Sequence, residues 1–139
     1  MLIVMKTRAQ VSMEYLVITA FMLVVAGIIF GFALFSFNAN SQFTKAQGFV
    51  EKVANNADLV ASLGEGSAVI FEADIPNGVQ AITLAENSVS MSIDLGNGIS
   101  DITAYARPSL TPASLITGAG RRSFSAAFSD GNVVVTEVG

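Results

Sequence analysis

The chain has 139 residues, of which 52% are hydrophobic and only 13% are charged, whereas soluble domains carry about 25% charged residues. It contains no His and no Cys, which excludes a Ser-His triad, a thiol nucleophile, a zinc finger and a disulfide framework. The net charge of −4 argues against a nucleic-acid partner, because such proteins need a basic surface.

Two basic residues, Lys6 and Arg8, precede a long apolar segment. Basic residues on this side of a span keep the N-terminus in the cytoplasm and export the rest of the chain. A secretory signal peptide would instead be cut after the apolar segment at a small-x-small triplet, and the sequence has no convincing triplet there. Residues 1–4 are apolar and lie ahead of the basic residues, so we expect Met5 to be the true start.

The stretch from Lys6 to Leu16 reads Lys-Thr-Arg-Ala-Gln-Val-Ser-Met-Glu-Tyr-Leu. It resembles the class III signal peptide of archaeal type IV pilins, in which Gln-x-Ser-x-Glu is followed by a hydrophobic run. Leu often stands four positions after the Glu in that family, and this chain has Ile18 there, which is a conservative departure.

The resemblance implies that residues 1–9 are a leader, removed when a prepilin peptidase cuts between Ala9 and Gln10. The hydrophobic segment then stays on the mature protein. The residues that the resemblance assigns to peptidase recognition are Lys6, Arg8 and Ser12.

Glu14 is a carboxylate at the start of the apolar segment, where charge is costly and usually functional. The resemblance implies that Glu14, the fifth mature residue, pairs with the N-terminal amine that cleavage creates on Gln10 of a neighbouring subunit. Such a pair offsets part of the cost of burying either charge alone. The alternative is that Glu14 lies among lipid headgroups and interacts with the positive end of the helix dipole.

The segment Tyr15–Phe37 is almost entirely apolar and carries no formal charge. At about 1.5 Å per residue it is long enough, as a helix, to cross a hydrocarbon core of about 30 Å. We predict a transmembrane helix over residues 15–37 that becomes the filament core, with a buried core helix as the alternative. Within it, Gly27 and Gly31 form a small-xxx-small pattern that lets helices approach closely, although glycine is also common in membrane helices generally.

Apolar residues continue beyond the span at spacings of three and four: Phe43, Ala46, Val50, Val53, Ala57 and Val60. This stripe predicts an amphipathic second half of one long helix over residues 10–63, ending at Leu63–Gly66. A kink or melted turn at Asn38–Gln42 is one option. The stripe is expected to pack against the following domain, and a free-standing coiled coil is the competing use.

From Ser67 onward the hydrophobic period changes to two, as at Val89, Met91 and Ile93. A head domain over residues 67–139 is therefore predicted, with strands at 67–73, 79–86, 88–95, 100–107, 122–129 and 133–138. The fold class is α+β: a long N-terminal hydrophobic and amphipathic helix followed by a small antiparallel all-β head, the pilin-like lollipop layout.

Nothing in the head predicts catalysis or a cofactor. Asp94, Asp101 and Asp130 lie near turns, where Asp serves backbone conformation, and no calcium-loop spacing is present. Arg121 and Arg122 are expected to pair with neighbouring carboxylates. We therefore predict neither an enzyme nor a metal site.

These features predict a structural subunit of an archaeal type IV pilus-like surface filament, with the head outside the cell and a role in adhesion. The expected partners are other copies of the chain, membrane lipid before assembly, the prepilin peptidase and the pilus assembly machinery. The alternatives are a single-pass, membrane-anchored surface protein that never polymerises and a minor pilin that primes or caps a filament. An archaellin is less favoured, because the residues usual after cleavage in that family differ.

Overall fold

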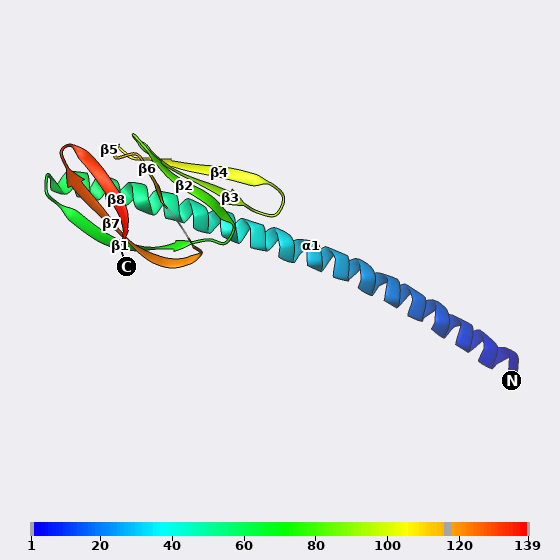
Figure 1. Ribbon diagram of the computed structural model, residues 1–139. Helices are drawn as coiled ribbons and strands as arrows, with labels where there is room; N and C mark the ends of the chain where they lie inside the picture. Colours follow the sequence, from blue (N-terminus) through cyan, green and yellow to red (C-terminus); the bar gives the residue numbers. More distant parts are fainter. Residues whose placement is uncertain (1, 116–117, 139) are drawn as a thin grey trace. The chain divides into compact units, whose positions relative to one another are not determined.

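One helix, α1 (Leu2–Leu63), forms the N-terminal part of the computed structural model, which describes residues 2–115 and 118–138 (Figure 1). The helix begins before residue 10, so residues 2–9 of the predicted leader are helical too. Residues Asn38–Gln42 lie inside α1, and the melted turn considered there is absent. The chain separates into two compact units between Asn38 and Ala39, and α1 contributes to both.

The helix ends where the sequence predicts. Gly64 and Gly66 have φ angles of 98° and 85°, a left-handed conformation that glycine adopts without a Cβ clash. The Gly64 N–H donates to the Ala61 carbonyl at 3.3 Å and closes the last turn.

Within the described residues, eight strands follow the helix, and the six predicted strands are all present with shifts of at most two residues. They are β1 (Ala68–Ile75), β2 (Val79–Ala85), β3 (Ser88–Asp94), β4 (Ile99–Tyr105), β5 (Ser109–Leu110), β6 (Ala113–Leu115), β7 (Gly120–Ser129) and β8 (Asn132–Val138). The two that the sequence did not predict, β5 and β6, have only two and three residues. Strands this short show no alternation that could reveal them.

The strands form two four-stranded sheets rather than one. Their orders are β1-β7-β8-β5 and β4-β3-β2-β6. All pairs are antiparallel except β5 with β8, which is parallel. Strands β1 and β4 are long edge strands of the two sheets. The head is therefore antiparallel-rich, as expected, but has two layers.

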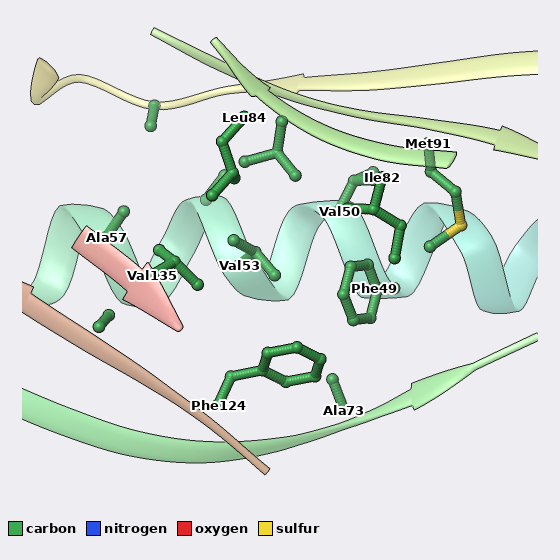
Figure 2. Packing of buried hydrophobic residues seen from close by; sticks show 14 of the residues in the cluster. Phe49, Val50, Val53, Ala57, Ala73, Ile82, Leu84, Met91, Phe124 and Val135 are labelled. Atoms are coloured by element: carbon green, nitrogen blue, oxygen red, sulfur yellow. The ribbon is translucent and has the colours of Figure 1, made fainter. Parts of the chain in front are cut away.

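The second half of α1 lies between these two sheets and completes their shared core (Figure 2). Phe49 packs edge-to-face on Phe124 of β7, with ring centroids 5.5 Å apart, and Phe71 of β1 stacks on Phe124 at 5.9 Å. Figure 2 shows Ile82 and Met91, from β2 and β3, on the other side of the helix. A helix with sheets on both sides buries a broad stripe, which explains how so small a head forms a core without disulfides.

The predicted amphipathic stripe is confirmed at five of its six positions. Ala46, Val50, Val53, Ala57 and Val60 are each at most 1% exposed. The exception is Phe43, which is 40% exposed, and the stripe is wider than predicted because Phe49 and Ala54 are buried as well.

Candidate assembly surface

Residues 15–37 of the first unit form a helix whose surface is almost entirely apolar on all sides. Between Val11 and Phe37 every large hydrophobic side chain except that of Val25 is 54–74% exposed. The most apolar 18-residue stretch has a mean hydropathy of 2.7 and is not buried by any other part of the described chain. This helix is long and apolar enough to cross a membrane, and an apolar surface of this extent requires lipid or protein to cover it.

Glu14 lies on this surface one helical turn after Gln10. The two side chains line a shallow, open hollow together with Met13, Val17 and Ile18. Within the described residues, the Glu14 carboxylate makes no hydrogen bond and no ion pair. Glu14 is therefore a carboxylate in an apolar depression. No group of the described chain compensates its charge.

Gly27 and Gly31 leave a gap in the same helix surface. A Cβ built at either position meets no atom within 4 Å outside the local helix. Residues four apart lie on the same side of a helix, so a second helix can approach the backbone closely along this line.

The Thr19 hydroxyl, within the span, is satisfied locally. Thr19 Oγ1 donates to the Tyr15 carbonyl at 2.9 Å, so this hydroxyl needs no partner when the helix enters an apolar environment. Glu14 thus differs from Thr19, because its carboxylate has no partner within the described residues.

The residues assigned to processing all lie on exposed helix. Lys6, Arg8, Ala9 and Ser12 occupy the turns around the proposed cleavage bond and are open to solvent. All of them belong to the first of the two compact units.

The three aspartates that the sequence singled out do not converge. Asp94 Oδ1 accepts the Gly96 N–H at 2.9 Å in the turn between β3 and β4, and Asp101 accepts a hydrogen bond from the Ser92 hydroxyl. Asp130 has a φ of 54° in the tight β7–β8 turn, where its backbone N–H donates to Glu65. In residues 2–115 and 118–138, no cluster of three or more acidic side chains has the arrangement of a metal site.

The adjacent arginines pair with carboxylates, as predicted. Arg121 Nε lies 3.2 Å from Asp74 Oδ1 and Arg122 Nη1 lies 2.7 Å from Glu137 Oε1. The hydrogen bond to Asp74, with the nearby charges of Asp74 and Glu72, raises the pKa of the Arg121 guanidinium. Both pairs link neighbouring strands of one sheet, so they serve the head itself.

Comparisons with protein-family models, curated proteins and solved structures found no match to this chain.

Proposed function

We propose that this protein is a structural subunit of an archaeal type IV pilus-like surface filament. The observation that carries the proposal is the apolar helix surface of residues 11–37, which nothing in the described chain covers and which bears a single uncompensated carboxylate. The resemblance of the stretch around Gln10 and Glu14 to a class III signal peptide supports the same reading.

The first stage takes place in the membrane. The helix lies in lipid with its basic N-terminal residues in the cytoplasm and its head outside. The prepilin peptidase then cuts between Ala9 and Gln10, which leaves a free ammonium group on Gln10 at the edge of the apolar segment. Removal of Lys6 and Arg8 with the leader also removes the charges that hold the N-terminus on the cytoplasmic side.

The second stage is assembly by helix packing. The ammonium of one subunit approaches the Glu14 carboxylate of a neighbour, in the hollow formed by Met13, Val17 and Ile18. Each charge compensates the other in a medium of low polarity, whereas either alone is costly. The gap at Gly27 and Gly31 lets the backbones of neighbouring helices approach, and the surrounding aromatic side chains fill the remaining space.

The alternatives differ in what covers the apolar helix. In a non-polymerising, membrane-anchored surface protein, lipid covers it permanently, and Glu14 has no role beyond the headgroup region. A minor pilin covers it with a different pilin. The hollow that brings Gln10 and Glu14 together favours contact with another processed subunit, and adhesion is the role that the filament would serve.

Deletion of the gene and complementation test this proposal. We expect the deletion strain to lose a class of surface filaments and the complemented strain to regain it. In a strain without the peptidase, the uncut chain should accumulate in the membrane fraction. An unchanged set of filaments in the deletion strain would favour the membrane-anchored alternative.

A further inference from the structure

The part of α1 within the head carries opposite charges on two sides of its buried stripe. Lys45 and Lys52 lie on one side, which we term the basic flank, and Glu51 and Asp58 lie on the other, which we term the acidic flank. Seven residues separate the members of each pair, about two helical turns, so each pair is aligned along the axis.

Each flank opens onto a groove beside an edge strand. On the acidic flank, Glu51 and Gln47 border a groove of about 360 Å³ against β4, whose Asp101 adds a second carboxylate. On the basic flank, Lys45 and Lys52 border a groove of about 220 Å³ against β1. The two grooves therefore differ in charge as well as in position.

No ion pair among the described residues involves the charged groups of these flanks. In the described residues, the ion pairs involve Arg121 and Arg122, while Lys45 and Lys52 have no carboxylate within 4.0 Å. Asp74, which borders the basic groove, is already held by Arg121.

Hydrogen bonds from other groups of the chain orient both carboxylates of the acidic flank. Gln47 Nε2 donates to Glu51 Oε1 at 3.0 Å, and the Arg107 backbone N–H donates to Asp58 Oδ1 at 2.8 Å. At about 100° per residue, Lys45 and Glu51 lie about 120° apart around α1, so these two groups can meet only between copies.

We propose that the basic flank of one copy docks on the acidic flank of the next, with Lys45 opposite Glu51 and Lys52 opposite Asp58. The two surfaces differ, so the contact is heterologous and can add copies in one direction without closing. In each pair the lysine of one copy lies opposite a carboxylate six residues further along the chain of the next copy. Neighbouring parallel helices are therefore staggered by about 9 Å along the axis. This inference rests on the proposed filament function and adds a contact between heads to it.

The contact is electrostatic and exposed, so each ion pair contributes modestly and salt weakens it. The apolar helices hold the filament, and the flanks set the register of the heads. Reversing one charge should therefore speed subunit release rather than abolish filaments.

Charge reversal at the pair Lys45 and Glu51 provides the test. Filaments sheared from cells producing Lys45→Glu, Glu51→Lys or the double variant are exposed to mild detergent, and released subunits are measured over time. We expect each single variant to release subunits about two to ten times faster than wild type at low salt. The double variant should return to the wild-type rate, and the difference should vanish at about 1 M salt. Glu86→Lys, the same charge change on the β2–β3 turn, is the matched control and should behave as wild type.

A carbodiimide that joins amines directly to carboxylates gives a second readout. Lys45 and Glu51 lie on different sides of one helix, so an amide bond between them joins two copies and appears as a dimer whose peptides contain both residues. If the double variant is no better than the single variants, or no such dimer forms, this head contact is wrong although the filament stands. If wild-type cells make no filament from this chain, the filament function and the contact both fail.

Discussion

At the scale of single residues, the carboxylates of the described chain differ in whether they have partners. Asp74 and Glu137 pair with arginines, Asp58 accepts a backbone N–H from Arg107, and Glu65 accepts one from Asp130. Glu14 has no such partner and lies among apolar side chains. Its loss should therefore affect what the protein binds, and leave the fold unchanged.

The first prediction concerns Glu14→Ala. We expect normal cleavage of the leader but few or no filaments, because the ammonium on Gln10 of the adjacent subunit then remains unpaired in an apolar medium. Immunoblotting of membrane and sheared fractions measures both outcomes. Glu86→Ala, which removes an exposed carboxylate from the head, is the control and should assemble normally. Wild-type amounts of filament from Glu14→Ala would refute the pairing mechanism.

A second prediction at this scale concerns Phe124, which is fully buried and contacts both Phe49 and Phe71. Phe124→Ala should lower the free energy of unfolding of the head by about 3–5 kcal/mol, through lost burial and a residual cavity. Denaturant unfolding of the detergent-solubilised chain, followed by circular dichroism, measures it. Ile70→Ala, at a side chain that is 68% exposed, should change the value by less than about 0.5 kcal/mol. Equal effects would mean that the core is elsewhere.

Among the elements, the helix and the strands are each indicated by their own spacing of hydrophobic residues. The stripe from Ala46 to Val60 has helical spacing, and the alternation at Val89, Met91 and Ile93 places a strand with one buried face. Both patterns are local, so the sequence alone shows them. The buried Phe49 follows the same spacing, three residues after Ala46, so the same local pattern indicates it.

The features that escaped prediction depend on contacts between distant segments. β5 pairs in parallel with β8, and β6 pairs with β2, so neither strand exists without its partner. The division into two sheets likewise results from packing on both sides of α1. In the candidate site, the sequence predicts Glu14, Gly27 and Gly31 from their residue types and spacing. The charged flanks of the head, by contrast, can be recognised only from the positions of the edge strands in the structure.

The prediction for the apolar helix concerns Gly27→Leu. A leucine there fills the gap through which a second helix approaches, so we expect the chain to enter the membrane and be cleaved but to yield far fewer filaments. Ala33→Leu, which adds bulk on another side of the same helix, is the matched control and should have a smaller effect. If both variants reduce the filament yield equally, assembly is sensitive to added side-chain volume anywhere on the helix, and the glycine positions have no special role.

At the scale of the whole molecule, the two units have different environments. The described core contains residues from Ala46 onward and none from the first unit. The head therefore includes the second half of α1, whereas in the proposed function the apolar first half is covered first by lipid and then by other subunits.

This division predicts how fragments behave. Residues 39–139 should form a soluble, folded monomer that unfolds cooperatively on heating, because they retain the whole described core. Residues 67–139 lack the seven buried side chains of α1 and should remain unfolded or aggregate. Size-exclusion chromatography and circular dichroism distinguish these outcomes. A stable fold without the helix would show that α1 is not needed by the sheets.

Whether processed copies of this chain build a filament through their apolar helices can be measured on the filaments themselves. Surface filaments are sheared from cells, inspected by electron microscopy, and their subunits analysed by mass spectrometry of the N-terminus. We expect filaments made of this chain with Gln10 as the first residue. Filaments that lack the chain, or contain it with residues before Gln10 still attached, would contradict it.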